Sequence, residues 1–563
     1  MLQLKDLIQS SANAVLTAQN ISCPVNRLPV ELLTKIFECI MQDARVDDGF
    51  TFPLPKGDVM RELVRLNHVC RFWRQIFTSS PHLFSTLHLQ RGVPSSLVEY
   101  FLRHSSTHPL TVYATTASSA GAFNLISIAQ HADRLQHLQL DFDWDAFVRK
   151  DGRAIFHKPA PLLERFDCCI LPPEGLRSVH WPPALPRVFD GSTPRLRQLR
   201  LSGFSSFPVG LFRDLTHICI EGWSSFKPAH PLGFGEVINL LRDNPRVEEV
   251  YLSHIDTWVH HESLRMTPDD VPENFSLELM NLRRLSLCDC TVAQLGKVFK
   301  HLQLTRGTIL SLTRILDEFA HHTSDIFVDY QGHLDNLADL YSATVDLSGK
   351  GAIATGLSGA LRILRGTGFN ILRDLLFCSP FRSLRELWIR GREEAIVRPD
   401  WSQVLTRFPL LEKLCIDSTG ASYIISALSF PSPILCAPSQ PDGAVAPPSL
   451  CKHLQTLWII AISHIEGLLF SAPYSSILSC VQNRSARRSP IRHLRIYYES
   501  SDSNSDAFRC DPEAAALYGW SEEKLGTLRQ YVDVVELGAG CLQMEISQEF
   551  KEGTHPQFWP RYM

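Results

Sequence analysis

The chain has 563 residues, of which 44% are hydrophobic and 20% are charged. This length and composition predict a substantial buried core in more than one domain, or in one module and a long repeat array, and exclude a largely disordered protein. Lysine and arginine number 55 and aspartate and glutamate 59, a formal net charge of −4. The chain as a whole therefore lacks the basic surface of a nucleic-acid-binding protein.

The cysteines and the apolar segments indicate the cellular compartment. The 15 cysteines are spread singly through apolar segments without a repeated metal-ligand spacing, which is typical of a reduced intracellular protein with buried thiols. Polar residues interrupt every apolar run near the N-terminus, so no secretory signal is expected. The most apolar stretch, from Leu457 to Phe470, is too short to span a bilayer and contains His464 and Glu466. We expect a protein of the cytoplasm and/or the nucleus, with no membrane partner.

Two helical patterns separated by a loop lie between residues 23 and 89. The first, LPVELLTKIFECIM, opens with Pro29, and its apolar residues recur at intervals of three and four. The loop ends at Asp58, a predicted N-cap, and the second pattern, VMRELVRLNHVCRFWRQIF, has its apolar residues on one side. A third element, SPHLFSTLHL, ends in an alternation that predicts a first strand at Leu87 and Leu89.

These residues resemble the F-box, a three-helix module that docks on the small Skp-type adaptor of cullin-RING ubiquitin ligases. The resemblance covers about residues 25–89. It rests on Leu28-Pro29-Val30-Glu31-Leu32-Leu33 with Ile36-Phe37, on Val69-Cys70-Arg71-Phe72-Trp73 with Ile76, and on Pro81-His82-Leu83-Phe84. Two features depart from the family: the loop between the first two helices is longer than in common members, and Phe84 stands where tryptophan is usual.

The resemblance implies two sets of apolar residues with different roles. One set would face the adaptor: Leu28, Pro29, Leu32, Ile36, Val69, Cys70 and Trp73. The other set would hold the module together: Phe37, Leu66, Leu83 and Phe84. The alternative is an ordinary helical hairpin packed onto its own protein, because periodicity alone does not separate a partner surface from a core.

A short apolar phrase recurs ten times from residue 131 onward. In each phrase an apolar residue is followed by two mostly polar residues, an apolar residue, one further residue and another apolar residue. The phrases begin at Leu135, Leu163, Leu196, Leu215, Val247, Leu282, Leu384, Leu411, Leu454 and Ile491. They predict a degenerate leucine-rich-repeat-like solenoid, in which each phrase is a strand of a parallel sheet and amphipathic segments cover one side. A non-solenoid α/β domain is the alternative.

The predicted fold is mixed: a small all-α F-box-like module is followed by an α/β leucine-rich-repeat-like solenoid. We expect a helical or flexible lead-in at 1–22, the F-box-like domain at 23–89, the solenoid at 90–540 and a tail at 541–563. Residues 302–381 are interpreted as a continuation with eroded phrases. Proline-rich loops are predicted near 171–194 and 430–449, and a polar segment at 499–508. Similar arrays follow the F-box in many fungal members of the family, whose closing segments resemble residues 531–537.

Motifs that carry catalysis are incomplete. The segments 356–359 (GLSG), 349–351 (GKG) and 233–235 (GFG) lack the spacing of a nucleophile elbow, a phosphate loop and a dinucleotide site, and all three are interpreted as turns. Cys288-Asp289-Cys290 and the histidine pairs at 260–261 and 321–322 supply no four-ligand shell, and strand-end packing is expected for Cys288. No cysteine has the basic setting of a catalytic ubiquitin acceptor. We expect no enzymatic activity, no cofactor and no metal.

One cluster of positive charge follows the last helical segment of the array. Arg484, Arg487, Arg488 and Arg492, with Arg495 nearby, are candidates for binding an acidic or phosphorylated target. A solvated loop beside a strand is the alternative. Ser489 is a possible phosphorylation site within the cluster.

The F-box-like helices and the repeat together predict a non-enzymatic substrate receptor of an SCF-type ligase. Its helices would bind the Skp-type adaptor, and through it the cullin, and its array would bind a protein target. The alternative is a repeat scaffold without ligase association, whose N-terminal helices cap the solenoid. Exposure of Leu32, Ile36 and Trp73 would favour the receptor, and burial under the array would favour the cap. No set of catalytic residues in the sequence supports a third possibility, an enzyme with its active site in the proline-rich loops.

Overall fold

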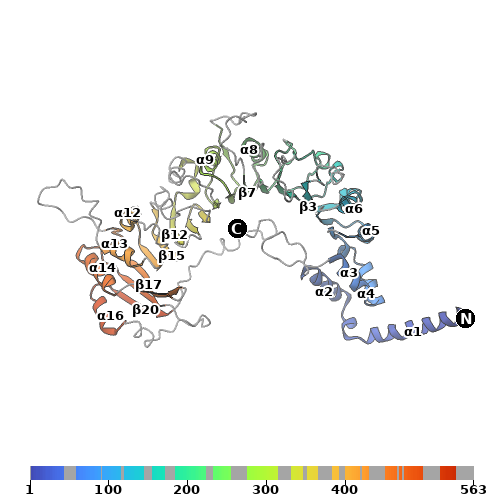
Figure 1. Ribbon diagram of the computed structural model, residues 1–563, viewed down its shortest axis with the longest axis horizontal. Coiled ribbons are helices and arrows are strands. Elements are labelled where there is room, and N and C mark those ends of the chain that lie inside the picture. The colour runs from blue at the N-terminus through green and yellow to red at the C-terminus, as the bar shows by residue number, and fades with distance from the viewer. Residues whose placement is uncertain are drawn as a thin grey trace. The chain divides into compact units, whose positions relative to one another are not determined.

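The computed structural model describes most of the chain, in a series of separate ranges. These are residues 2–43, 59–89, 92–115, 119–144, 147, 155–171, 184–208, 210–222, 233–254, 275–314, 331–346, 351–364, 383–391, 400–418, 421–429, 450–465, 468–471, 474–498 and 520–539. The described residues fall into two compact units, the first ending at Val247 and the second beginning at Glu248. Both are drawn in Figure 1 and are described separately below.

The first unit opens with helices only. In chain order they are α1 (Leu2–Ser22), η1 (Pro24–Arg27), α2 (Val30–Asp43), α3 (Val59–Asn67), α4 (Arg71–Thr78) and η2 (Pro81–Phe84). The second helical pattern of the sequence is divided between α3 and α4. The division falls at Cys70, whose backbone is extended and whose Sγ accepts a hydrogen bond from the backbone N–H of Trp73, so that it N-caps α4. The predicted N-cap Asp58 lies outside the described residues.

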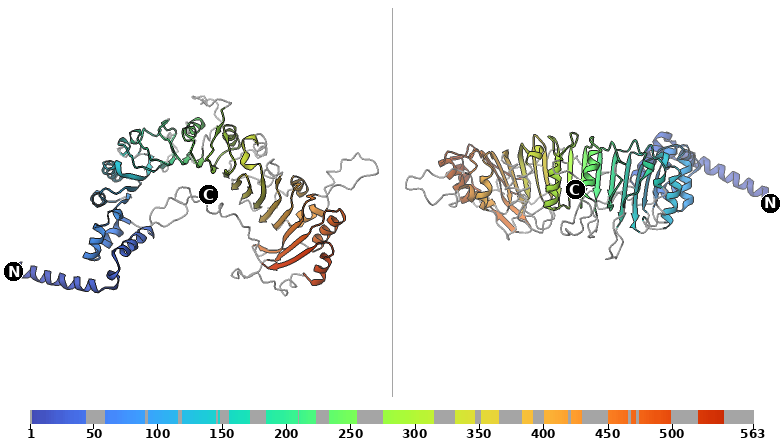
Figure 2. Two further views of the ribbon diagram at one scale, coloured as in Figure 1. Left: turned by 180° about the vertical axis from the view of Figure 1, so that it is seen from behind. Right: turned by 90° about the horizontal axis from the view of Figure 1, so that it is seen from above.

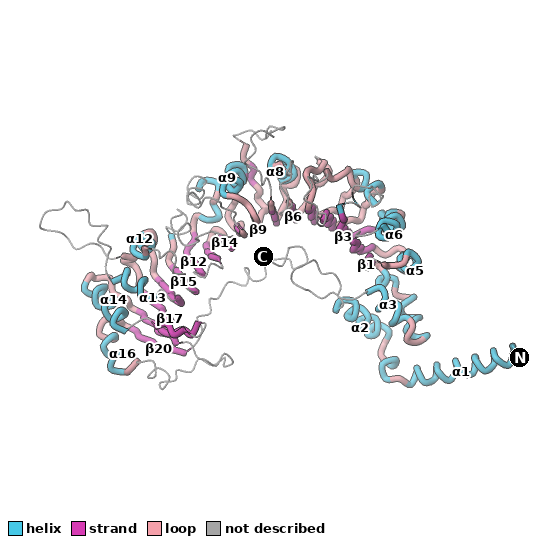
Figure 3. Tube along the Cα trace, in the orientation of Figure 1, coloured by secondary structure: helices cyan, strands magenta, loops and turns pink. Residues whose placement is uncertain are grey.

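A parallel sheet follows in the first unit, with its strands paired in chain order from β1 to β6. Helices α5, α6 and α8 lie along one face of this sheet (Figure 3). The elements are β1 (Thr86–Leu89), α5 (Ser95–His104), β2 (Leu110–Thr115), α6 (Ser119–Ala129), η3 (Ala132–Arg134), β3 (Leu135–Asp143), β4 (Arg165–Leu171), η5 (Phe189–Gly191), β5 (Gln198–Ser202), β6 (His217–Glu221) and α8 (Phe234–Arg242). The predicted first strand at Leu87 and Leu89 is confirmed as β1.

The second unit is also built on a mostly parallel sheet. Its spatial order is β7, β9, β11, β14, β13, β12, β15, β16, β17, β19, β20. The strands are β7 (Glu249–Ser253), β8 (Leu277–Glu278), β9 (Arg284–Cys288), β10 (Leu302–Gln303), β11 (Ile309–Thr313), β12 (Leu340–Asp346), β13 (Gly351–Gly356), β14 (Ala360–Leu364), β15 (Glu386–Gly391), β16 (Lys413–Ser418), β17 (Thr456–Ile465), β18 (Leu468–Ser471), β19 (His493–Tyr498) and β20 (Val534–Ala539). Strands β8 and β10 form a separate pair, and β18 pairs antiparallel with the end of β17.

Helices cover one face of the second sheet. They are α9 (Val292–His301), η7 (Gln331–His333), η8 (Asp335–Leu337), α12 (Trp401–Thr406), α13 (Ala421–Ser429), α14 (Tyr474–Ala486) and α16 (Glu522–Leu528). Figure 2 shows the strands of each unit side by side, and no described helix lies on the opposite face of β15 to β20. We call the opposite face of the second sheet the helix-free face. Among the described helices, none has the length and apolar composition of a membrane span.

The second and third apolar residues of all ten phrases lie in strands, and their alternation with the intervening residue places them in the core. The second apolar residue of one phrase pairs in register with that of the next, as in Leu138, Phe166 and Leu199. These residues are buried, because the apolar face of each strand is covered by the return segments. Together with the N-terminal helices, this confirms the predicted fold class of a helical module followed by an α/β repeat solenoid.

Residues 302–381 continue the sheet, but two of their strand pairings break the parallel pattern. Strand β13 runs antiparallel to both β12 and β14. The turn from β13 to β14 is too short for the crossover that parallel neighbours require, so the chain reverses directly. This turn is the segment 356–359, as predicted; a Cβ on Gly356 would lie 2.5 Å from the carbonyl oxygen of Asp339. The prediction of a turn at 233–235 is wrong, because Gly233 is the N-cap of α8 and the next two residues lie in that helix.

Several predicted segments lie wholly or largely outside the described residues. They are the proline-rich loop near 430–449, the polar segment 499–508, the histidine pairs at 260–261 and 321–322, and the tail 541–563. Of the loop predicted near 171–194, residues 172–183 lie outside, and the described part contains η5 and the buried side chains of Leu185, Val188 and Phe189. Part of segment 349–351 lies outside as well, and Gly351 begins β13.

Candidate functional site

Helix α2 has two apolar faces with opposite environments. Leu33 and Phe37, four residues apart, are fully buried. Leu32 and Ile36 have the same spacing on a neighbouring face and remain 52% and 40% exposed. A helix that exposes one apolar stripe while burying another has more apolar surface than its own chain covers.

Aromatic packing holds the helices together on the buried side. The Phe37 ring stacks on Phe77 of α4 at 4.3 Å between centroids and meets the Trp73 ring edge-on at 5.0 Å. Trp73 is half-buried, and its Nε1 donates a hydrogen bond to Asn26 Oδ1 at 2.6 Å. Trp73 is therefore anchored within the module at its indole nitrogen, while part of its ring stays accessible.

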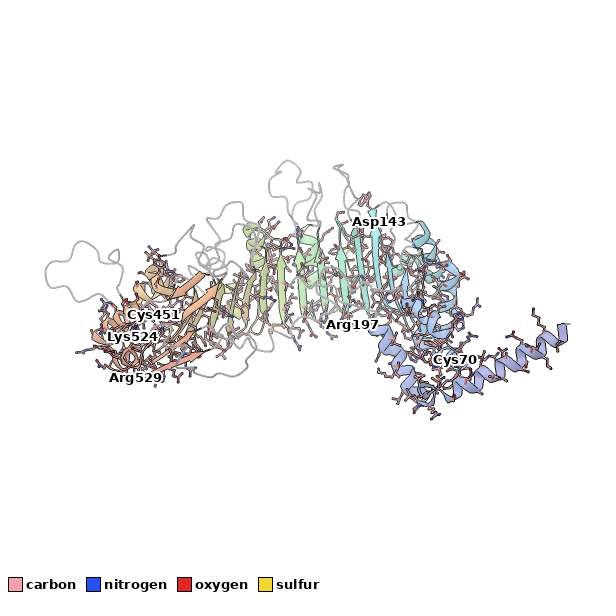
Figure 4. All side chains as sticks on the ribbon, turned by 60° about the horizontal axis from the view of Figure 1, so that its bottom comes forward. Cys70, Asp143, Arg197, Cys451, Lys524 and Arg529 are labelled. Carbon is pink, nitrogen blue, oxygen red and sulfur yellow. The ribbon has the colours of Figure 1, made fainter. Side chains whose placement is uncertain are left out.

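The residues predicted to face an adaptor differ in exposure. Leu32, Ile36 and Val69, the last 57% exposed, form what we call the exposed apolar set. Of the others, Pro29 is exposed, Leu28 and Trp73 are half-buried, and Cys70 is 8% exposed. Cys70, labelled in Figure 4, acts in the described structure as the N-cap of α4, so its side chain has little surface to offer a partner.

Charged side chains flank the exposed apolar set on α2. Lys35 Nζ lies 2.8 Å from Glu38 Oε2, and His82 Nε2 lies 3.2 Å from Glu38 Oε1. The hydrogen bond between Lys35 and Glu38 lowers the pKa of Glu38 and raises the pKa of Lys35. Such surface pairs contribute little to stability, but they fix the charge around an apolar surface.

The helical module is joined directly to the first repeat. Phe84 of η2 is buried, with its ring 5.3 Å from that of Phe101 and 5.9 Å from that of Tyr100, both on α5. Asn67 Nδ2 donates a hydrogen bond to the Tyr100 hydroxyl at 2.9 Å. Phe84 thus packs where the resemblance implies a tryptophan, and it links the module to the array. These contacts leave Leu32, Ile36 and Val69 uncovered.

A comparison with family models gives a match over this segment: residues 25–90 match the F-box-like model. Residues 25–90 form an F-box-like domain. No curated protein matches the chain. Strand β1 is both the end of the F-box-like domain and the first strand of the sheet, because Leu87 and Leu89 pair with β2. The domain is therefore continuous with the array through its last residues.

The helix-free face of the second unit holds an aromatic cluster that the sequence did not single out. Trp388, Cys415 and Trp458 stand in register on three neighbouring strands. Lys413 Nζ lies 3.9 Å from the Trp458 ring centroid and 5.0 Å from that of Trp388, and the Arg495 guanidinium lies 4.8 Å from Trp458. Aromatic rings with cations above them are enriched at protein interfaces. Their only sequence signal is aromatic residues at the non-core positions of the strand phrases.

The four arginines predicted to bind a target differ in exposure. Arg484 is 1% exposed and cannot contact a target, so its prediction as a target-binding residue is wrong. It lies on the buried face of α14 and donates to the carbonyl oxygens of Leu450 at 2.7 Å and Cys451 at 2.9 Å. Arg488 and Arg492 are exposed and Arg487 is half-buried, so these three stay candidates, whereas Ser489 is buried. Figure 4 labels Cys451 in this region.

Several buried cysteines are in environments that disfavour the thiolate. Burial raises the pKa of the Cys169, Cys451 and Cys480 thiols to about 12, 12 and 11. Cys288 is buried at the end of β9, as expected, and its Sγ donates to Asp289 Oδ2 at 3.0 Å. Among the described residues, no group of three or more histidine, cysteine or acidic side chains is placed to hold a metal.

Proposed function

We propose that this protein is a substrate-recognition subunit of an SCF-type ubiquitin ligase. The F-box-like domain binds the Skp-type adaptor, and through it the cullin, with Leu28, Pro29, Leu32, Ile36, Val69 and Trp73 at the contact. The observation that carries the proposal is the exposed apolar set on a segment that matches the F-box-like model. Three such side chains left uncovered by a well-packed module are expected to be buried by a partner.

The array, which we interpret as a degenerate leucine-rich-repeat array, binds the protein target. In support, its helix-free face holds Trp388, Trp458, Lys413 and Arg495, residue types that dominate binding energy at interfaces. The receptor performs no chemistry itself. It holds a lysine of the target near the charged conjugating enzyme and so raises the effective concentration of the two reactants.

The same residues argue against a cap role for the N-terminal helices. In a cap, Leu32 and Ile36 would be covered by the array, whereas both are exposed. The contacts of the module with the array are made instead by Phe84 and Asn67, which leave α2 uncovered on one side. The scaffold without ligase association remains the outcome expected if no adaptor binds.

Co-purification from cells tests the proposal. The tagged chain should recover the Skp-type adaptor, and a variant carrying Leu28→Asp and Pro29→Asp should lose it while keeping the wild-type circular dichroism spectrum. Met280→Asp is the matched control, because Met280 is 70% exposed and lies outside the F-box-like domain. Equal recovery of the adaptor by the wild type and the double variant would overturn the proposal. The double variant also retains targets that would otherwise be consumed, so proximity labelling with it identifies clients.

A further inference from the structure

Two arginines of the sheets form no ion pair, although one of them, Arg284, stands in register with Glu249 of β7. Six arginines stand within described strands, and four of them form ion pairs with a neighbouring carboxylate. The pairs are Arg165 with Asp167, Arg200 with Glu221, Arg390 with Asp417 and Arg495 with Glu536. The other two, Arg284 of β9 and Arg362 of β14, form no ion pair with any residue that the structure describes.

The two arginines lie on the helix-free face, around one residue of the strand between them. Ser311 of β11 pairs in register with Ser286 on one side and with Arg362 on the other. Arg284 precedes Ser286 by two residues on the same face, and Thr313 follows Ser311 by two. Ser286 and Arg362 therefore flank Ser311 directly, while Arg284 and Thr313 lie on the same face, two residues before and two residues after that level.

Each of these four side chains has an enclosed polar atom without a hydrogen-bond partner in the described structure. The atoms are Arg284 Nη1, Ser286 Oγ, Thr313 Oγ1 and Arg362 Nε. Ser286 is only 1% exposed and Thr313 is also buried. An enclosed donor without an acceptor destabilises the fold, and an enclosed charge without a counter-charge does so more strongly. Four such donors at neighbouring positions of one sheet face are the arrangement expected of a site that an anion completes.

The local charge supports this interpretation. Burial lowers the pKa of Arg362, and the neighbouring charge of Arg284 lowers it further. Burial also lowers the pKa of Arg284, which Glu249 on β7 partly offsets. The two guanidinium groups therefore repel one another, and Glu249, which pairs in register with Arg284, lies on the side of β9 away from Arg362.

We propose that Arg284, Ser286, Thr313 and Arg362 form a binding site for a phosphoryl group. Two guanidinium charges and two hydroxyl donors match a phosphate monoester, which carries about two negative charges and three terminal oxygens. A carboxylate offers only two oxygens to the four donor side chains. The site adds a ligand class to the target-binding array of the proposed function. Its test needs no adaptor, so each proposal can fail without the other.

Inorganic phosphate is the first probe of the site. Added to the full-length chain at constant ionic strength, with chloride as the reference salt, phosphate should raise the thermal unfolding midpoint of the second unit. The rise should be lost in Arg284→Gln and in Arg362→Gln but kept in Arg283→Gln, which removes an exposed charge one residue away. Equal stabilisation of all three variants would show that phosphate acts elsewhere and would overturn the proposal.

The free protein supplies a second readout. Arg362→Met should leave the unfolding midpoint in chloride unchanged or higher, because it removes an uncompensated charge. A clear fall in that midpoint would mean that Arg362 is already compensated, and would count against an anion site. This measurement also separates a lost site from a variant that fails to fold.

Two further probes distinguish the source of the phosphoryl group. A degenerate phosphoserine peptide library, compared with its unphosphorylated counterpart, represents a modified protein segment, and tripolyphosphate represents a soluble compound. Binding of either probe that falls at least tenfold in Arg284→Gln and Arg362→Gln supports the site and names its source. Binding of neither, or binding that both variants retain, overturns it.

Discussion

Replacing Arg484 with methionine should destabilise the second unit, although its place among four neighbouring arginines makes it look like a surface charge. The guanidinium donates to the carbonyl oxygens of Leu450 at 2.7 Å and Cys451 at 2.9 Å, and a longer contact of 3.5 Å reaches Leu454. Methionine has a similar length and fills the space, but it donates no hydrogen bond. The variant therefore leaves the buried carbonyl of Leu450 without a partner, whereas the carbonyl of Cys451 keeps the hydrogen bond from the backbone N–H of Leu454.

The size of the effect follows from these contacts. The orphaned carbonyl of Leu450 costs about 1–3 kcal/mol and the lost hydrogen bond to Cys451 about 1 kcal/mol, and relief of the buried charge returns part of the sum, because burial lowers the pKa of Arg484. A net loss of about 2 kcal/mol is expected. For a unit of this size the loss corresponds to a fall of about 4 °C or more in the unfolding midpoint.

Differential scanning calorimetry of the full chain measures the loss, with Arg492→Met as the matched control. Arg492 is exposed and makes no side-chain hydrogen bond to a described residue, so the control should stay within about 0.5 kcal/mol of the wild type. Hydrogen exchange of residues 450–459 should accelerate in Arg484→Met only. If the two variants unfold at the same midpoint, the carbonyl contacts of Arg484 do not stabilise the fold and the reasoning is refuted.

Three further predictions concern other parts of the chain. Phe37→Ala should cost about 3–5 kcal/mol in the F-box-like domain, because it removes a fully buried ring between Trp73 and Phe77, and faster hydrogen exchange in α2 and α4 would show it. Asn244→Ala should cost about 2–4 kcal/mol, since this buried side chain bonds Phe212 O, Leu215 N and Leu240 O; urea unfolding measures the loss, and an unchanged midpoint would contradict it. Burial raises the pKa of Glu236 to about 7, above its unfolded value, so the stability that the protonated form confers is present below about pH 4.5 and is lost as the pH rises through about 7. Glu236→Gln should therefore match the wild-type unfolding midpoint at pH 5 and exceed it at pH 8, and equal midpoints at both values would refute the shift.

The array was largely predictable because its strands obey a local rule. Each phrase alternates apolar and polar residues. On a strand that helices cover on one face only, this alternation by itself decides which side chains are buried. The exception is β12 to β14, where the middle strand, GAIATG, lacks the leucines of the phrase. Their antiparallel pairing depends on the length of two turns and on which strand reaches β11 first, which no residue pattern encodes.

The site was less predictable, because exposure depends on packing between elements. Leu32 and Leu33 are adjacent and chemically identical, yet one is exposed and the other buried. The sequence did contain a signal that Arg484 is buried. It follows Ile477, Cys480 and Val481 at the spacing of one helix face, so it belongs to the apolar face of that helix. The sequence contains no signal that Arg284 and Arg362 are partly buried without an ion pair, since arginine at a polar strand position is usually solvated or paired.

The most direct test of the account is a titration of the purified full-length chain with the purified Skp-type adaptor. Wild-type protein should bind, and Leu32→Asp with Ile36→Asp should weaken the affinity by more than about 100-fold, because each buried apolar side chain contributes about 1.5–3 kcal/mol. Met280→Asp should bind like the wild type. An adaptor that fails to bind the wild type, or that binds the Leu32 and Ile36 double variant with unchanged affinity, would contradict the claim that these side chains are left exposed for a ligase partner.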